Sequence, residues 1–259
     1  MTTAATTHAD PLKTALGFAA LGLLAAVIAG GALLQRAPDP VFLPVMADRP
    51  VMLPNGRALY VQRHEVTITE WARCVAQDAC AQAVRARAGQ DPATTPATGL
   101  SYIDVQDYLA WINDATGHAF RLPTAGEWHV MAAAVLPDEP DPIFTDPSLT
   151  WASTYLTEGT APRALKPQGS FTTSPEGIAD LDGSVWEWTQ ECYAGASDST
   201  DPSRCPAFFV GGEHVAAMSY LVRDPARGGC AVGTPPAHLG MRLVTDDAIR
   251  QSRVTSDSQ

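Results

Sequence analysis

The sequence is short of basic residues. It contains 17 Lys and Arg residues against 28 Asp and Glu residues, which gives a formal net charge of −11. A surface with this charge repels the phosphate backbone of DNA and RNA, so the composition argues against nucleic-acid binding. The same excess of carboxylates is compatible with the binding of divalent cations.

Charged residues are absent between Lys13 and Arg36. The apolar run at residues 15–35 matches the roughly 20 residues that a helix needs to cross a bilayer. We therefore predict a transmembrane anchor there, after a short tail at residues 1–14. A cleaved signal sequence is the alternative, because the small residues at 30–32 would suit a cleavage site. The flanking basic residues give only a weak bias for orientation.

Cysteine spacings typical of metal sites are also missing. Cys74 and Cys80 lie close together in the chain, and Cys192 and Cys205 bracket a short polar loop. Cysteine ligands of a metal site are typically separated by about two residues or accompanied by nearby histidines. Local pairs around short loops instead indicate disulfides in an oxidising compartment. We therefore predict a single-pass protein of the inner membrane with its domain in the periplasm, in which Cys230 is left over.

The remaining chain divides into three parts. We expect a proline-containing linker and lead-in segment at residues 36–57, a folded domain at 58–246 and a disordered tail at 247–259. Within the domain, proline and glycine are frequent, which is typical of loops and tight turns. Short helices followed by scattered short strands indicate an α+β domain with much irregular structure.

Three short helices are predicted from their capping residues. We expect helix starts at Thr69, at Ser101 with its partner Asp104, and at Thr124 with its partner Glu127. The hydroxyl of the first residue of such a pair accepts a hydrogen bond from the helix backbone, and the carboxylate three positions on accepts one from the backbone N–H of the first residue.

The chain contains four characteristic segments in order: HEVTITEWARCV (64–75), RLPTAGEW (121–128), DGSVWEW (182–188) and LGMRLV (239–244). These segments resemble the formylglycine-generating, or sulfatase-modifying factor, family. The resemblance covers about residues 58–245 and implies a C-type-lectin-like, irregular α+β fold. The two cysteine pairs resemble those of exported members.

These segments identify a fold better than they identify an activity. Trp128, Trp186 and Trp188 are expected in the core rather than in a catalytic site. Arg121 and Glu127 are candidates for a buried structural pair.

The resemblance implies a structural Ca²⁺ ion at the DGSVWEW turn. Carried over onto this sequence, the ligands are the side chains of Asp180 and Glu187 and the main-chain carbonyls of Gly183 and Val185. Ca²⁺ takes about six to eight oxygen ligands, which a glycine turn between carboxylates can supply. The alternative is a solvated acidic turn.

The resemblance also implies copper, but the ligands are missing. Active members oxidise a substrate cysteine to formylglycine with O₂ and a Cu(I) ion held by two cysteines, ligands that suit this soft metal. Counting back from LGMRL places the two positions at Ser219 and Asp224, and neither offers a thiolate. Cys230 has no second cysteine as a partner, and a buried or exchanging thiol is a commoner role for it than a reactive one. Copper is therefore not expected.

Iron is not expected either. The ergothioneine-type branch of the superfamily binds iron through three histidines in a separate helical domain, which is not recognisable here. The histidines of this chain are isolated and lack ligand spacing: His8, His64, His118, His129, His214 and His238.

Two functions follow from these observations. The leading prediction is a non-copper member of the family, anchored in the membrane, that binds or helps to mature an exported protein partner such as a redox enzyme. The alternative is an enzyme, either the family oxidase or one with altered chemistry. Its groove would contain Ser219, Tyr220, Arg223, Asp224, Arg227 and Cys230. A solvated loop with ordinary ion pairs is the competing interpretation of that groove.

Overall fold

The computed structural model describes residues 39–136, 164–193, 205–212, 216–224, 230–232 and 238–249. The predicted anchor at 15–35 and the tail at 1–14 lie outside this part, as does most of the predicted C-terminal tail. Among the helices that are described, none has the length and apolar character needed to span a membrane.

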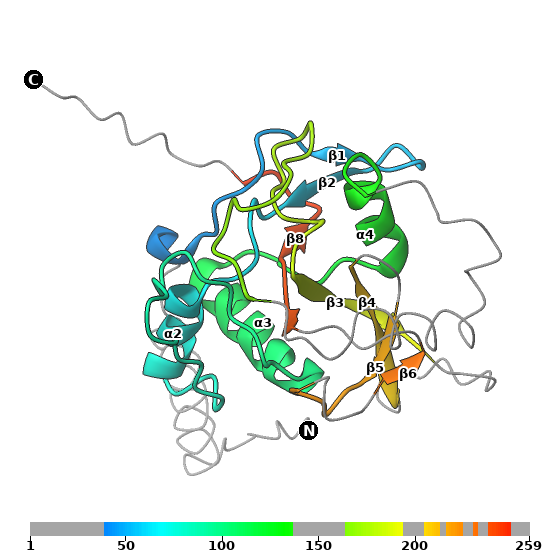
Figure 1. Ribbon diagram of the computed structural model, residues 1–259. Helices are drawn as coiled ribbons and strands as arrows, with labels where there is room; N and C mark the ends of the chain where they lie inside the picture. Colours follow the sequence, from blue (N-terminus) through cyan, green and yellow to red (C-terminus); the bar gives the residue numbers. More distant parts are fainter. Residues whose placement is uncertain are drawn as a thin grey trace, which may run out of the picture. The chain divides into compact units, whose positions relative to one another are not determined.

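Three α-helices are present in the described residues: α2 (Ile68–Ala76), α3 (Tyr102–Thr116) and α4 (Ala125–Ala132). A short 3₁₀ helix, η1 (Pro40–Phe42), precedes them within the segment predicted as linker. Helices α2 and α3 pack together, whereas α4 packs against the strands β3 and β4, whose bounds are given below (Figure 1).

Each α-helix begins with a capping box. The predicted pairs Ser101 with Asp104 and Thr124 with Glu127 are confirmed at α3 and α4. The predicted start of α2 at Thr69 is wrong, since its cap is Thr67, whose backbone N–H donates to the Glu70 carboxylate at 2.7 Å. Two threonines stand next to this helix start, and Thr67 is the one with a glutamate three residues later.

The strands form two sheets in the described part of the chain. The first contains β1 (Val51–Met52), β2 (Ala58–Val61) and β8 (Val244–Thr245), antiparallel and in that order. The second has the order β6-β5-β4-β3-β7, and only its β3–β7 pair is parallel. Its strands are β3 (Val185–Cys192), β4 (Ala207–Gly211), β5 (Ala216–Ser219), β6 (Cys230–Val232) and β7 (His238–Gly240).

The closing segment LGMRLV passes from one sheet to the other. Its first residues belong to β7 and its last to β8, so Met241, Arg242 and Leu243 lie between the sheets. The segment LGMRLV is therefore shared between two strands that belong to different sheets. The α+β class with little regular structure is confirmed.

The tryptophans of the signature segments lie in the core, as predicted. Trp128, Trp186 and Trp188 are all buried. A Cβ atom on Gly211 would come within 2.2 Å of the Trp128 ring, and one on Gly212 within 2.3 Å of the Trp186 ring. The two glycines therefore let the backbone pass directly over the indoles.

Both predicted disulfides are present. Cys74 and Cys80 are joined with a Cα–Cα distance of 5.3 Å, and Cys192 and Cys205 with a Cα–Cα distance of 5.8 Å. The first links the end of α2 to the loop that follows it. The second links the end of β3 to the residues before β4.

Candidate functional site

A buried carboxylate, Glu187, joins three of the four characteristic segments. Trp128 donates from Nε1 to its Oε2 at 2.9 Å, and Arg242 donates from Nε to its Oε1 at 2.9 Å. Trp128 comes from RLPTAGEW, Glu187 from DGSVWEW and Arg242 from LGMRLV. The segments that carry the resemblance therefore meet in one hydrogen-bonded cluster in the interior.

The guanidinium of Arg242 is completely buried and fully engaged. It also donates to the carbonyl oxygens of Gln62, Arg63 and Ala179 at 2.7–3.1 Å. Burial alone would lower the pKa of Arg242, but the nearby carboxylates, Glu187 foremost, outweigh burial and raise it. Arg242 is therefore a permanent internal cation that holds together segments from both sheets.

A second buried carboxyl, Glu65, lies beside this cluster. Its Oε2 is 3.8 Å from Arg242 Nη2 and has no hydrogen-bond partner in the described residues. Burial raises the pKa of Glu65 to about 8, even though Arg242 opposes the shift. At neutral pH Glu65 is therefore mainly protonated and uncharged.

Arg121 and Glu127 form the predicted structural pair. Two nitrogens of Arg121 contact the two oxygens of Glu127, at 2.6 and 2.9 Å. Burial would raise the pKa of Glu127, but the hydrogen bonds from Arg121 and the Thr124 backbone lower it overall. This pair stabilises the start of α4 and leaves Trp128 in position to reach Glu187.

The side chains predicted to bind calcium are held by N–H donors. Asp180 accepts hydrogen bonds from the backbone of Gly169 at 2.6 Å and of Phe171 at 2.9 Å. Glu187 is held by Trp128 and Arg242, as described above. In the structure, the carboxylate oxygens of both side chains therefore accept hydrogen bonds from donors of this chain. The described residues also contain no cluster of three or more His, Cys, Asp or Glu side chains suited to a metal. Whether Ca²⁺ binds in solution stays a prediction.

The predicted groove lies where β5 ends. Ser219 is half-buried at the end of the strand, and Tyr220 and Leu221 form the turn that follows. The backbone of Cys230 pairs with that of Met218, one residue before Ser219. Arg223 and Asp224 follow the turn and are exposed. Arg227 lies outside the described residues.

The Arg223 side chain is held in a two-point ion pair. Its Nε and Nη2 contact the two carboxylate oxygens of Asp104 at 2.8 and 2.7 Å. Burial would raise the pKa of Asp104, but the hydrogen bonds from Arg223 and Ser101 lower it overall. Asp104 thus both caps α3 and fixes the segment after β5. Arg223 therefore joins the segment after β5 to the start of α3.

Comparison with known families decides the identity of the fold. The model of the family described as "Sulfatase-modifying factor enzyme 1-like domain" matches residues 24–247. The chain belongs to this family. It is 27% identical over 183 residues to the formylglycine-generating enzyme of Mycobacterium tuberculosis, which covers 60% of this chain and 59% of that enzyme. The resemblance read from the four segments is therefore confirmed.

Solved structures of similar fold agree with this assignment. PvdO from Pseudomonas aeruginosa matches with a TM-score of 0.50 and 18% identity, over 78% of this chain and 92% of that one. At this identity the likeness supports the fold alone. Since the chain spans only 59% of the length of the M. tuberculosis enzyme, that enzyme's activity does not carry over with the family membership.

The copper ligands of active sulfatase-modifying factor enzymes have no counterpart in the described residues. Four of the five cysteines form the two disulfides, so Cys230 is the one cysteine outside them. Ser219 and Asp224 offer oxygen rather than sulfur at the positions obtained by counting from LGMRL. The residues present do not fit a Cu(I) ion held by two thiolates.

Sequence reasoning missed two functional relationships in this family member. Nothing in the sequence around Glu65 predicts a buried carboxyl beside Arg242. Asp104 was identified as a capping residue, but its partner Arg223 is 119 positions away. Asp104 and Arg223 carry opposite charges, but opposite charge alone does not predict which residues pair when they are 119 positions apart in the sequence.

Proposed function

We propose that this chain is a non-copper member of the sulfatase-modifying factor family that binds an exported protein partner or assists its maturation. In this proposal the segment 15–35 anchors the protein in the inner membrane, and the domain at 58–246 works in the periplasm. The proposal combines the cysteine pairing with the character of the surface around the predicted groove.

The cysteine pairing supports the absence of copper chemistry. Oxidation of a substrate cysteine in this family depends on two thiolates on one Cu(I) ion, and a disulfide sulfur is not a thiolate. With both disulfides formed, one reduced cysteine remains in the chain. Disulfides around short loops also support an oxidising compartment such as the periplasm.

The observation that carries a binding role is an apolar patch formed by Ile103, Tyr220 and Leu221. All three large side chains are exposed, Leu221 by 60%. The Tyr102 backbone donates to the Tyr220 carbonyl at 3.1 Å, which joins the first turn of α3 to the turn after β5. Clustered exposed apolar side chains mark interaction surfaces, and tyrosine is frequent at their energetic centres.

The charged groups beside this patch suit binding better than catalysis. Arg223 and Asp104 neutralise each other, so this pair leaves no unpaired charge to activate a substrate. An enzyme of altered chemistry is the alternative, and it would have to use Ser219, Asp224, Arg227 or Cys230.

Site-specific photo-crosslinking in cells tests the binding role. A benzoylphenylalanine placed at Leu221 is expected to give a discrete cross-linked product of higher mass. Met52 is a matched control, because its side chain is 62% exposed but lies on β1. The Leu221 product should disappear when Tyr220→Asp is added. Identical products from Leu221 and Met52, or none from Leu221, would contradict the proposal.

A further inference from the structure

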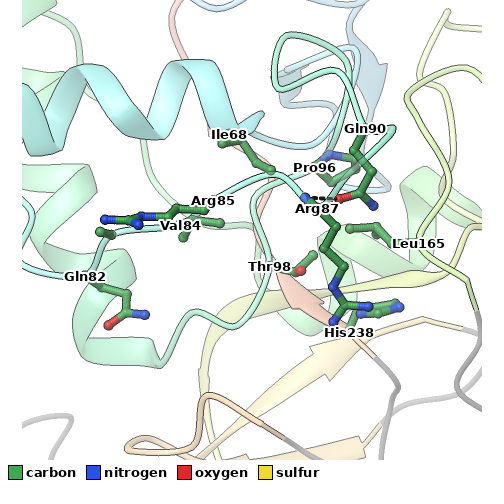
Figure 2. Close-up of a pocket in the computed structure, with 11 residues that line it drawn as sticks. Ile68, Gln82, Val84, Arg85, Arg87, Gln90, Pro96, Thr98, Leu165 and His238 are labelled. Atoms are coloured by element: carbon green, nitrogen blue, oxygen red, sulfur yellow. Dashed lines mark hydrogen bonds between the residues drawn. The ribbon is translucent and has the colours of Figure 1, made fainter.

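A pocket separate from the predicted groove lies under the loop between α2 and α3. Its volume is about 220 Å³, and it shares no lining residue with the groove. Ile68, Val84, Pro96 and Leu165 provide apolar surface in its wall (Figure 2). Polar groups come from glutamine, threonine, histidine and arginine, and none of its described lining residues is acidic.

The loop that forms this pocket is fixed at both ends. Trp71 donates from Nε1 to the Gln82 carbonyl at 2.7 Å, close to the Cys74–Cys80 disulfide. At the other end, the Ala97 backbone donates to the Val66 carbonyl at 2.8 Å. A pocket that is already formed requires little ordering when a ligand enters.

Within this loop, Arg87 is held by a tight turn. Its backbone N–H donates to Gln90 Oε1 at 2.8 Å, and the Gln90 backbone donates back to the Arg87 carbonyl at 3.0 Å. Gly89 supplies the positive φ of 84° that this turn requires. Figure 2 shows the Arg87 side chain directed toward His238, whereas Arg85 extends in another direction.

The arginines of this pocket differ from the others that the structure describes. Every other described arginine donates to a carboxylate or a carbonyl oxygen. Within the described residues, neither Arg85 nor Arg87 forms an ion pair, and the hydrogen bond that Arg87 donates comes from its backbone N–H. In a chain with a net charge of −11, the Arg87 cation at a pocket whose described lining residues include no carboxylate makes a local site for an anion.

We infer that this pocket binds the C-terminal carboxylate of a peptide whose last residue is aliphatic. Arg87 would hold the carboxylate through its planar fork of N–H donors, the geometry that guanidinium offers to carboxylates. The apolar wall of the pocket would contact the aliphatic side chain of that same terminal residue. The pocket is smaller than the roughly 300–1,000 Å³ of typical small-molecule sites, which favours one terminal residue over a whole cofactor. This inference is independent of the binding role proposed for the apolar patch.

Fluorescence anisotropy with the full chain tests this inference. The ligand is a fluorescein-labelled Gly-Ser-Gly-Ser-Leu peptide with a free C-terminus, compared with the same peptide as its C-terminal amide. We expect saturable binding of the free acid and at least about tenfold weaker binding of the amide, since a charge-assisted hydrogen bond is lost. A peptide with an internal Glu and an amidated end distinguishes a side-chain carboxylate from a terminal one and should bind as weakly as the amide.

Two arginine variants provide a matched comparison. Arg87→Ala is expected to weaken binding of the free acid about tenfold or more. Arg87→Lys should keep only part of the wild-type affinity, because lysine has the charge but lacks the planar fork of guanidinium N–H donors. Arg85→Ala removes the same charge from the same loop and should change the affinity by about twofold or less. Unchanged melting temperatures would show that the variants fold. Equal losses in the two alanine variants, equal binding of acid and amide, equal competition by inorganic phosphate, or no saturable binding would each overturn the inference.

Discussion

Arg242 contacts Glu187 with two nitrogens in the interior of the domain, from Nε at 2.9 Å and from Nη2 at 2.8 Å. Both side chains are almost completely excluded from solvent. This pair connects the closing segment LGMRLV with the tryptophan segment DGSVWEW, and Trp128 adds the segment RLPTAGEW through the same carboxylate. These three characteristic segments therefore have a structural role in the interior of the domain.

Removal of one partner of this pair should destabilise the domain strongly. Arg242→Met leaves the Glu187 carboxylate buried without its cation, and loss of one member of a buried pair costs about 3–5 kcal/mol. Urea unfolding should show this loss of unfolding free energy. The double variant Arg242→Met with Glu187→Gln should lose less than the sum of the single variants, because neither charge is then left alone.

Arg223→Met is a control for that experiment. The Arg223 side chain is 51% exposed, and its partner Asp104 keeps its hydrogen bonds to Ser101. We expect a loss of about 1 kcal/mol or less, since exposed ion pairs are screened by solvent. If Arg223→Met and Arg242→Met cost the same, the Glu187 cluster would not have the structural role described here.

Glu65 should make stability depend on pH. The pKa of Glu65 is raised from 4.5 to about 8 in the folded chain, chiefly by burial, so the folded state binds a proton that the unfolded state releases. The stability that this gives is complete below about pH 4.5 and is lost as the pH rises through about 8. The unfolding free energy of wild type should therefore fall relative to that of Glu65→Gln between pH 5 and pH 8, because the carboxyl ionises in the unfolded chain while it stays protonated in the folded one.

His64 has an opposite effect in part of that range. Burial lowers its pKa below the ordinary value of 6.5, so its contribution to stability is lost as the pH falls. Because His64 is present in both proteins, the comparison of wild type with Glu65→Gln cancels it. A difference that does not change with pH would contradict the buried, protonated state of Glu65.

Thiol counting tests the cysteine pairing. Alkylation of the denatured, unreduced chain should modify a single cysteine, Cys230, and alkylation after reduction should modify all five. Peptide mapping by mass spectrometry identifies the modified residues. Five modified cysteines without reduction would contradict both the disulfides and the periplasmic location that we propose.

Calcium binding is tested by thermal melting. The resemblance implies a Ca²⁺ ion held in part by Asp180 and Glu187, so the melting temperature is expected to be lower with a chelator than with excess Ca²⁺. A ligand that binds only the folded state would raise it. A clear decrease on chelation would show that the ion implied by the family resemblance is present.

The sequence allowed prediction of the features that depend on neighbouring residues. Ser101 and Asp104 marked the start of α3, and Gly117, with its φ of 66°, ends this helix. The two disulfides followed from local spacing. Thr67 was missed as the cap of α2 because it also continues an apparent strand, so two local patterns competed for one residue.

Features that depend on distant residues were not predictable in this way. Glu65 and Arg242 come together only because the closing segment passes between the sheets. The pocket lined by Arg87 depends on a loop with no helix or strand, whose shape is set by the anchors at Trp71 and Ala97. Periodicity and capping residues carry no information about such contacts.

Formylglycine formation is the most direct measurement of the central claim that this family member lacks copper oxidase chemistry. The full chain is loaded with Cu(I) under conditions that preserve its disulfides and is incubated in air with a cysteine-containing sulfatase-type peptide. An active formylglycine-generating enzyme serves as the positive control. Mass spectrometry should show an unchanged peptide. Turnover to the peptide aldehyde, with the corresponding loss of mass, would contradict this account.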